Sequence, residues 1–471
     1  MLLNALNVMG NCRFLRQKKQ VLVNGEWVDT RSFRYLPLCD ESHSIVSIRG
    51  GLTNHIYNVG LVGGENAQIE TSNTGSGSIE IAPTAIISGV ADIDIDHVRP
   101  ITDTDAVQIY NCKIKSLIGT RTKKLKIYCS SLIDKPTEKE GFFGSSTFSE
   151  IYLEPSAISN LTSMYEMFGW CDKLESLDTK NWDTSNITTM ERMFVTCKKL
   201  QAIDASNWNT SNVTTMEEMF LYCYKLESLD VSKWDVSNCT NMFRMFEGCE
   251  SIQTIDVSNW DVSNCISLGS MFEDCHSLQT IDVSKWNTSN CLSMDRMFKN
   301  CYSLKSLDVT NFTFAKGCNI FGMFIGCSSL KSLNVTGLNF TNTGGNLGHM
   351  FNECSSLVSL DLSSWNTSNI TKIYDMFIDC SSLVSLDLSS WDTSKVDDMD
   401  GVFYRCSSLV SLNISGWDMS KVTDRYMEYM FYGCKSLRTI YMIGCNQTTI
   451  DKIKKALSWD NILNQVTIIT E

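Results

Sequence analysis

Eleven cysteines recur at an almost constant interval along this chain. The interval is 26 residues six times and then 27, 26, 26 and 28 residues. A fixed period of roughly 20–50 residues is typical of a solenoid, in which each repeat stacks on its neighbours. The interval therefore predicts that these cysteines are stacked core residues, and not a metal site or a catalytic nucleophile. They are Cys171, Cys197, Cys223, Cys249, Cys275, Cys301, Cys327, Cys354, Cys380, Cys406 and Cys434.

Large apolar residues form a second ladder in phase with the cysteines. Phe312 and Leu338 stand in two units where tryptophan is missing, and a methionine–phenylalanine pair such as Met245-Phe246 recurs at the same period. A buried tryptophan removes roughly 150–250 Å² from water, which is up to about 4–6 kcal/mol of gross transfer energy. Because no single unit can bury its own apolar residues, the units must stack. The tryptophans are Trp182, Trp208, Trp234, Trp260, Trp286, Trp365, Trp391 and Trp417.

Each unit combines two periodicities. Leu229 and Val231 alternate with polar residues, which is typical of a short, half-buried strand. Met242, Met245 and Phe246 fall at positions i, i+3 and i+4, which places them on one face of a helix. We therefore expect each unit to run through a strand, a turn, a short helix and a second turn.

Threonine–glutamate pairs indicate where these helices begin. Thr188 and Thr214 are each followed three residues later by a glutamate, Glu191 and Glu217. This spacing is typical of a capping box, in which each side chain bonds the backbone N–H of the other residue. It predicts a helix start at each of these threonines.

The apolar residues of one unit have the spacing of a leucine-rich repeat. The pattern is Leu226-x-x-Leu229-x-Val231-x-x-Trp234, with tryptophan where asparagine usually stands. Together with units such as Met376–Ser394, which joins Met-Phe, Cys-Ser-Ser-Leu and Leu-Asp-Leu-Ser-x-Trp-Asp-Thr-Ser, it resembles the BspA-like leucine-rich repeats. The resemblance is to their tryptophan-containing variant, found in Mycoplasma-type lipoprotein repeats.

The resemblance covers about residues 154–443 and implies both a fold and a type of function. The expected fold is an α/β solenoid: a right-handed leucine-rich-repeat stack of about 11 strand–helix units of 26 residues. The residues before it predict a β-rich N-terminal domain. The family implies a non-enzymatic surface module of bacteria, certain parasites and their phages, associated with adhesion, and it brings no catalytic residue.

The pattern divides the chain into four segments. Val21–Val28 predicts a β-hairpin with Asn24-Gly25 as its turn, and Lys135–Ser146 is polar and glycine-containing, as in a surface loop or linker. After residue 445, Ile450, Ile453 and Leu457 and the run Val466–Ile469 indicate a helix and a closing strand. The segments are 1–60, with the hairpin; 61–150, an irregular β-rich region or degenerate solenoid cap; 151–445, the leucine-rich-repeat solenoid; and 446–471, a helix–strand cap.

Charge argues against nucleic acid as a partner. The chain has a net charge of −13. Residues 154–443 contain 34 acidic and 21 basic residues, so the whole excess lies on the repeats. Phosphate binding needs basic patches, which this distribution does not supply.

The chain contains 20 cysteines, and most of them are expected to be buried thiols. Cys239, Cys265 and Cys291 share a repeat position with Ile187 and Val213, so this position takes a small hydrophobic residue. Disulfides and metal binding stay open as alternatives, although no C-x-x-C pair occurs. Reduced thiols suit assembly in a reducing cytoplasm.

The start of the chain does not resemble a signal peptide. Its apolar residues precede a basic cluster at Arg13–Lys19, which is the reverse of the usual order. No run of residues is apolar enough to predict a membrane span. We expect a protein made in a bacterial cytoplasm and not exported by a classical signal.

A column of aspartates is the strongest candidate for a ligand site. Carboxylates about 4.8 Å apart repel by roughly 3–4 kcal/mol at an effective dielectric of 20, so donors, raised pKa values or a cation must offset them. Hydrogen bonds from neighbouring serines are one explanation, and a row of calcium ions or a polycationic partner is the other. Asn334 and Asn413 interrupt the column and favour the hydrogen-bonding explanation. The row includes Asp204, Asp230, Asp256 and Asp282.

The strand columns vary little, so recognition is expected at an edge, at the N-terminal domain or at the irregular stretch Thr310–Gly348. We found no catalytic or cofactor-binding residue. The leading hypothesis is a structural or host-recognition component of a bacteriophage particle, with virion proteins docked on the N-terminal region and a protein or glycan as surface ligand. The alternative is a BspA-like bacterial cell-surface adhesin exported by an unrecognised route. The oligomeric state is left open.

Overall fold

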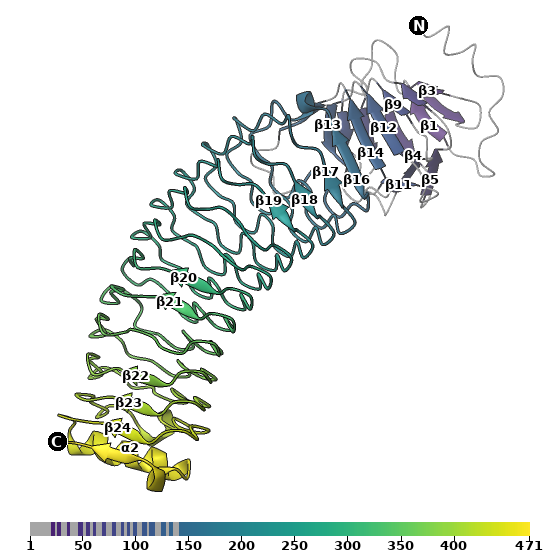
Figure 1. The fold of residues 1–471 in the computed structure, drawn as a ribbon. Coiled ribbons are helices and arrows are strands. Elements are labelled where there is room, and N and C mark those ends of the chain that lie inside the picture. The colour runs from purple at the N-terminus through teal and green to yellow at the C-terminus, as the bar shows by residue number, and fades with distance from the viewer. Residues whose placement is uncertain are drawn as a thin grey trace. The chain divides into compact units, whose positions relative to one another are not determined.

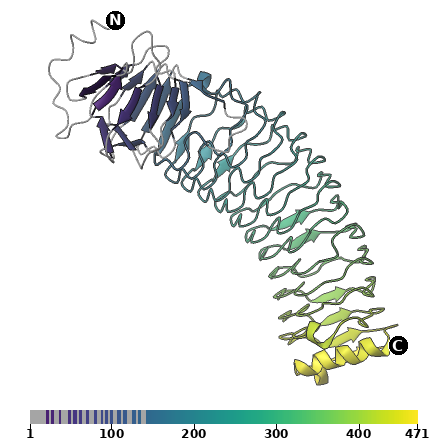
Figure 2. The same ribbon diagram turned by 180° about the vertical axis from the view of Figure 1, so that it is seen from behind.

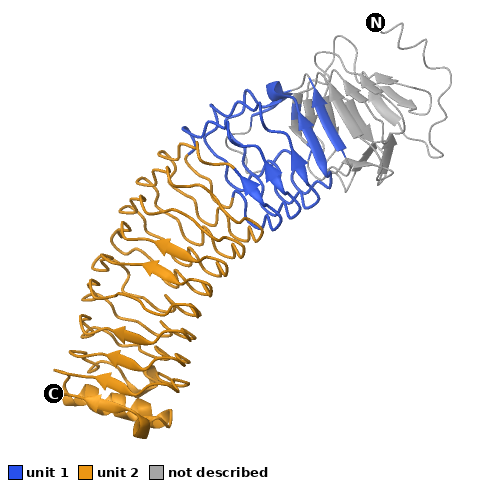
Figure 3. Ribbon diagram, in the orientation of Figure 1, with its two compact units in different colours: residues 1–213, 219–229 blue, residues 214–218, 230–471 orange. Residues whose placement is uncertain are grey.

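The computed structural model describes residues 141–471 in full (Figure 1). It also describes residues 117 and 133–134 and the strands between residues 20 and 132, with side chains only for some strand residues from Ile114 onward. The chain forms two compact units, Met1–Val213 with Met219–Leu229 and Thr214–Glu218 with Asp230–Glu471 (Figure 3). Both are parallel β-solenoids, and one turn of a solenoid is called a rung below.

A hairpin begins the first unit. Strands β1 (Gln20–Val23) and β2 (Glu26–Asp29) pair antiparallel, with Val23 opposite Glu26. This pairing agrees with the hairpin predicted from the sequence. Its turn residues, Asn24 and Gly25, lie outside the described residues.

Three sheets form the sides of the first solenoid. In the longest sheet, neighbouring strands are parallel, and consecutive members are one rung apart. Its order is β3 (Tyr35–Pro37), β6 (Gly60–Val62), β9 (Ile86–Ser88), β12 (Ala106–Tyr110), β14 (Lys124–Tyr128), β16 (Glu150–Leu153), β17 (Ser176–Leu177), β18 (Ala202–Ile203) and β19 (Ser228–Leu229). The second sheet contains β1, β2, β4 (Val46–Arg49), β7 (Gln68–Thr71), β10 (Asp92–Asp94), β13 (Lys113–Ser116) and β15 (Ser131–Leu132), and the third β5 (Thr53–Ile56), β8 (Ser78–Ile81) and β11 (Val98–Pro100).

Strand β14 shows why these segments are strands. Leu125 and Ile127 are buried, whereas Lys124, Lys126 and Tyr128 alternate with them and are half-buried. This period of two matches the alternation of side chains on the two faces of a strand. The same sheet continues into the 26-residue repeats through β16 and β17.

Part of the stretch predicted as a loop or linker belongs to the core. Phe142 and Phe143 are buried, and the Phe143 ring stacks on Phe168 at 5.4 Å between centroids. The Cys171 thiol donates to the Phe143 carbonyl at 3.1 Å. The prediction was therefore wrong for residues 141–146, because two phenylalanines outweigh the polar composition around them; residues 135–140 lie outside the described residues.

Many rungs of the second unit carry a short strand or an isolated bridge, and several pair at a second site as well. Its strands are β20 (Ser306–Asp308) and β21 (Ser332–Asn334), which pair, and the parallel series β22 (Ser385–Asp387), β23 (Ser411–Asn413), β24 (Thr439–Tyr441) and β25 (Thr467–Ile469). Parallel bridges join Asn241 to Ser267 and Ser267 to Ser293 along another side of the rungs. Several neighbouring rungs are thus paired at more than one place.

The helix predicted in each unit is absent from the described repeats. The N–H groups of Met242, Arg244 and Phe246 each donate to a carbonyl of the next rung at 3.0 Å. The Met245 N–H instead donates to the Met242 carbonyl of its own rung at 3.2 Å. Arg244 has a φ of 56°, a left-handed conformation that cannot continue a helix. The segment is therefore a series of turns bonded to its neighbour, and the strand–helix unit was wrong in its helix.

The predicted capping boxes are also wrong. The N–H and hydroxyl of Thr188 both donate to the Thr162 carbonyl on the neighbouring rung, at 2.8 and 3.1 Å. The Glu191 N–H donates to the Thr189 hydroxyl at 3.2 Å. Threonine at these positions therefore joins rungs, because the spacing of a capping box also suits hydrogen bonds between stacked turns.

The apolar ladders form the core of both units. In the second unit, Trp260 and Trp286 stack with 6.4 Å between centroids and a 2° angle between their planes. All sixteen described cysteines are free, and all but Cys445 are buried. The predicted ladder residues Cys223, Cys249, Cys275, Cys301, Trp208, Trp234, Trp260 and Trp286 are all buried.

A helix and a strand end the second unit (Figure 2). Helix α2 (Gln447–Trp459) begins at Asn446, whose side chain accepts a hydrogen bond from the Thr449 N–H at 2.8 Å. It buries Ile453, Ala456 and Leu457, and β25 pairs with β24. No helix among the described residues is long and apolar enough to cross a membrane. The described residues also contain three short 3-10 helices: η2 (Pro155–Ala157), η3 (Asp424–Tyr426) and η4 (Leu463–Gln465).

Candidate functional site

The aspartate column lies exposed on the strand side of the rungs. Aspartates in this column accept hydrogen bonds from nearby serines. The Ser232 N–H and hydroxyl both donate to one oxygen of Asp230, at 3.1 and 2.7 Å. Asp204, Asp256 and Asp282 make the same pair of bonds with the serine two residues on. One oxygen of each carboxylate is therefore occupied within its own turn.

The serine donors also set the charge state of the column. The Ser232 hydroxyl, and then its backbone N–H, holds the pKa of Asp230 below its usual value, and Ser284 does the same for the pKa of Asp282. Asn334 accepts the equivalent bond from the Thr336 hydroxyl at 2.9 Å. No cluster of three metal-ligating side chains occurs among the described residues. The geometry supports the hydrogen-bonding explanation for this column.

The irregular stretch Thr310–Gly348 is packed as core. Phe312 and Leu338 are buried in the places of tryptophans. Phe314 stacks on Phe340 at 5.5 Å, and Phe340 meets the edge of Trp365 at 4.5 Å. Phe314 and Phe340 therefore fill volume beside the missing indoles, whereas Phe321 of the same stretch is half-buried and contacts the rings of His349 and Tyr374.

The last rungs carry an exposed tyrosine cluster that the sequence analysis missed. We define the cluster as Tyr404, Tyr426, Tyr429 and Tyr432. Tyr404 stacks on Tyr432 at 5.2 Å, and Tyr429 meets both rings edge-on, at 6.5 and 6.3 Å. Tyr426, Tyr429 and Tyr432 are 41%, 56% and 47% exposed. The cluster therefore presents aromatic surface at repeat positions that hold mainly charged or aliphatic residues on earlier rungs, such as Arg244 and Glu247 where Tyr429 and Tyr432 stand.

Two signals in the sequence could have revealed the cluster. The last cysteine interval, from Cys406 to Cys434, is 28 residues instead of 26. Five of the chain's 15 tyrosines lie between residues 404 and 441. A longer interval adds residues to a rung whose core is already filled, so the added side chains must face solvent.

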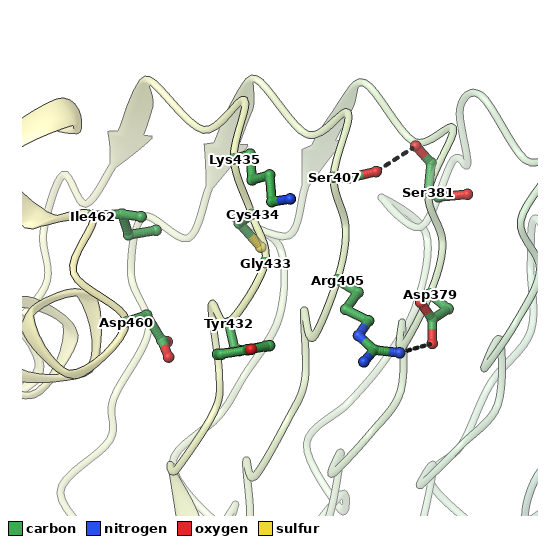
Figure 4. A pocket seen from close by; sticks show the side chains of 10 residues that line it. All are labelled: Asp379, Ser381, Arg405, Ser407, Tyr432, Gly433, Cys434, Lys435, Asp460 and Ile462. Carbon is green, nitrogen blue, oxygen red and sulfur yellow. Dashed lines mark hydrogen bonds and ion pairs between the residues drawn. The ribbon is translucent and has the colours of Figure 1, made fainter.

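A pocket of about 560 Å³ adjoins the tyrosine cluster (Figure 4). Asp379 and Arg405 occupy the same position on successive rungs, and Gly433 occupies it on the next one. Gly433 has a φ of 81°, and a Cβ there would lie 3.1 Å from both Cα and Cγ of Arg405. The missing side chain leaves space that Asp460 and Ile462, after α2, enclose from the other side.

Charged groups of both signs line this pocket. An Arg405 guanidinium nitrogen lies 3.9 Å from an Asp379 oxygen, and the guanidinium sits 5.0 Å from the centre of the Tyr404 ring. Asp460 accepts a hydrogen bond from the Phe431 N–H at 3.0 Å, and partial burial raises its pKa. Lys435 adds a second cation. The pocket can therefore hold a ligand with both acceptor and donor groups.

The thiol of this pocket is not a nucleophile near neutral pH. This thiol, Cys434, is buried and donates to the Phe403 carbonyl at 3.0 Å. Burial raises the pKa of Cys434 to about 12, so the thiolate needed for nucleophilic attack is not formed near neutral pH.

A smaller pocket lies on the strand side of the first unit. It has a volume of about 180 Å³ and is lined by residues of β14, β16 and β17 with Asp178. Two of the charged side chains that line it, Lys124 and Glu150, form an ion pair of 2.7 Å with each other. It is therefore a weaker candidate than the pocket beside the tyrosine cluster.

The sequence matches one known protein family. The family is described as "Mycoplasma protein of unknown function, DUF285", and it matches residues 162–280, 225–337 and 345–455, together more than half of the chain. No curated protein matches the chain.

Several solved structures align with the chain at low similarity. A complex of TLR13 with ssRNA13 aligns with 12% identity over 93% of this chain and 83% of that one, with a TM-score of 0.21. An internalin (inlF) from Listeria monocytogenes gives 13% identity, 74% and 80% coverage and a TM-score of 0.24. The plant peptide hormone receptor RGFR1 in complex with RGF2 aligns with 13% identity over 90% of this chain and 98% of that one, with a TM-score of 0.18. Likeness at this level does not extend to ligands.

Proposed function

The chain belongs to the DUF285 family of Mycoplasma proteins of unknown function, and we propose that it is a non-enzymatic recognition protein. In this proposal the regular rungs are a scaffold. The tyrosine cluster on the last rungs is the surface that contacts a protein or glycan displayed on a cell or particle. Its closer kinship with BspA-like repeats is part of the same proposal.

The exposed tyrosine cluster carries this proposal. Tyr429 and Tyr432 are about half exposed and are held by ring contacts with Tyr404, and Arg405 lies over the Tyr404 ring. Tyrosine and arginine are enriched among the residues that dominate binding energy at interfaces. Rings already held in place lose little conformational entropy when a partner binds. The aspartate column itself offers short polar side chains such as Asp230 and Ser232.

The finer proposal places the protein on a bacteriophage particle, with other virion proteins docked on its N-terminal region. Its support is that the sixteen described cysteines are free, which suits folding in a reducing cytoplasm before release by lysis. The net charge of −13 disfavours nucleic acid as the ligand. A cell-surface adhesin of the BspA-like type is the second candidate.

A binding assay on candidate host cells tests the recognition surface. Labelled wild-type protein is compared with a Tyr426→Ser, Tyr429→Ser double variant. The control is Ile266→Ser, Leu292→Ser, which changes apolar residues that are 46% and 49% exposed on earlier rungs. We expect the tyrosine variant to lose at least about tenfold in affinity, equivalent to about 1.4 kcal/mol, and the control to bind like wild type. Equal binding by all three proteins would refute the proposal.

Mass spectrometry separates the two settings. Peptides of this chain are quantified in purified phage particles and in cell envelopes. A fixed copy number per particle supports the virion protein. Detection in envelopes alone supports the adhesin.

A further inference from the structure

The pocket beside the tyrosine cluster contains more hydrogen-bonding capacity than its own residues use. Arg405 makes a single ion pair, at 3.9 Å, although a guanidinium has five N–H donors. Among the described residues, the Lys435 ammonium has neither a hydrogen bond nor an ion pair. Figure 4 shows the Lys435 amine directed toward the space between Ser407 and Arg405. Two cations therefore have donors available for a ligand.

Acceptors and hydroxyls face the same space. Asp379 and Asp460 lie at opposite ends of the pocket, and Ser381 and Ser407 lie along one side of it (Figure 4). The Ser407 hydroxyl makes only a long bond, 3.5 Å, to the Ser381 carbonyl. A ligand with several hydroxyl groups can donate to both carboxylates and accept from the serines.

This balance of charge selects the kind of ligand. Two cations face two carboxylates, so an acidic peptide or polyphosphate would meet Asp379 and Asp460 as like charges. A neutral sugar would leave the Lys435 ammonium without an ion pair and would not neutralise the Arg405 donors that Asp379, 3.9 Å away, does not use. A sugar with one carboxylate satisfies both conditions, because its carboxylate lies between the cations and its hydroxyls reach the aspartates.

Size and shape agree with this chemistry. The pocket holds about 560 Å³, within the roughly 300–1,000 Å³ of small-molecule sites. Tyr432 forms one side, and its ring is held by the stack on Tyr404 at 5.2 Å. An aromatic ring provides a flat apolar surface against which the C–H face of a sugar can lie.

We propose that this pocket binds a carboxylate-bearing sugar, held between Arg405 and Lys435 with its ring against Tyr432. The inference rests on the proposed recognition function and names the ligand class of the same surface. The sugar is the end of a surface glycan, and the tyrosine cluster contacts the residues that follow it.

Calorimetric titration with free sugars tests the inference. The probes are N-acetylneuraminic acid and glucuronic acid, with galactose as the neutral sugar and polyglutamate as the acidic peptide. The proteins are wild type, Arg405→Gln, Lys435→Gln and the control Lys316→Gln, an exposed lysine on an earlier rung. Melting temperatures check that every variant is folded.

We expect wild type and Lys316→Gln to bind at least one acidic sugar and neither galactose nor polyglutamate. Arg405→Gln and Lys435→Gln should each weaken that binding at least about tenfold, because each removes a charge-assisted hydrogen bond. The inference fails if no acidic sugar binds, if galactose or polyglutamate binds as well, or if the pocket variants match the control. When it fails but the Tyr426→Ser, Tyr429→Ser variant still loses cell binding, the recognition function stands and only the ligand class is wrong.

Discussion

The thiol of Cys301 donates a hydrogen bond to the backbone carbonyl of Phe272, with 3.2 Å between sulfur and oxygen. The same bond joins Cys275 to Phe246 at 3.3 Å and recurs in most described rungs. Each of these carbonyls belongs to a buried phenylalanine and also accepts a backbone N–H, from Cys275 for Phe272 and from Cys249 for Phe246, so the thiol bonds its second lone pair. The ladder therefore keeps cysteine because it is small, apolar and still a donor.

Replacing a ladder cysteine by valine should lower the free energy of unfolding more than the same change at Cys239, which belongs to a different repeat position shared with Cys265 and Cys291. Cys301→Val removes one of two donors to the Phe272 carbonyl, which keeps the Cys275 N–H at 3.2 Å, and we expect a loss of about 0.5–1.5 kcal/mol from the missing bond. Cys239 makes only a long bond of 3.5 Å to Asn241, and valine occurs at its repeat position. Cys239→Val is the matched control and should be nearly neutral. Urea unfolding measures both, and equal costs would contradict a role for the thiol donor.

The rate at which each cysteine is alkylated should increase with the exposure of its thiol to solvent. Burial raises the pKa of Cys327 to about 12, whereas Cys445 is only partly buried. Because the thiolate is the reacting species, native protein at pH 8 should be alkylated at Cys445 long before Cys327. Peptide mass spectrometry after a timed reaction with iodoacetamide gives the order. Rapid labelling of Cys327 without unfolding would show that the ladder is open.

Removing one stacked indole should destabilise the second unit strongly. Trp286 is fully buried, stacks on Trp260 and donates from Nε1 to the Val257 carbonyl at 3.1 Å. We expect Trp286→Ala to cost about 3–5 kcal/mol through the cavity it leaves. Leu292→Ala, at a position 49% exposed, is the control and should change stability by less than about 0.5 kcal/mol. Thermal unfolding compares them, and an unchanged melting temperature for Trp286→Ala would contradict the packed ladder.

Two aspartates should make the second unit more stable as the pH falls from 7 to 5. Burial, and then the charge of Asp398, raises the pKa of Asp375 from 3.8 to about 6. Burial, followed by Asp375, Asp398 and Glu428, raises the pKa of Asp400 to about 6. The folded protein binds these protons more tightly than the unfolded chain, so their contribution is full below pH 3.8 and is lost as the pH rises through 6.

His349 opposes this effect, because burial, and then Arg296, lowers its pKa, and its ring lies 3.5 Å from Asp375. Comparison with Asp400→Asn cancels the histidine contribution. We expect the variant to be more stable than wild type at pH 7 and the difference to shrink by pH 5. Asp230→Asn is the control of opposite sign: the pKa of Asp230 is lowered, so its contribution is present above pH 3.8 and is lost at lower pH. Urea unfolding at both pH values decides, and a pH-independent difference for Asp400→Asn would contradict the prediction.

The repeat period was enough to predict the stacked core, but not the path of the backbone around it. Cys301, Trp286 and their equivalents are buried as expected, because the period fixes which residues meet between rungs. The helical spacing of Met242, Met245 and Phe246 was misleading. Arg244 takes a left-handed conformation and bonds the next rung, and that choice depends on a neighbour that local sequence does not contain.

The site was harder to predict than the core. The aspartate column attracted attention because it repeats, yet its serine bonds are local to each turn. The pocket comes from a combination found at the end of the stack: Gly433, at a repeat position that Gly248 and Gly326 also occupy, lies beside Asp460 and Ile462 after the helix. That these residues enclose a pocket can be seen only once the rungs are stacked and the end of the stack is known.

A serine scan of exposed positions across residues 141–471 tests the central claim most directly. Each variant is displayed on yeast and sorted for binding to host cells, with a conformation-independent tag to measure expression. The account predicts that the losses of binding fall between Asp379 and Ile462, at the tyrosine cluster and its pocket. Losses centred on the aspartate column, at Asp204, Asp230, Asp256 and Asp282, would contradict it and would make the regular rungs the recognition surface.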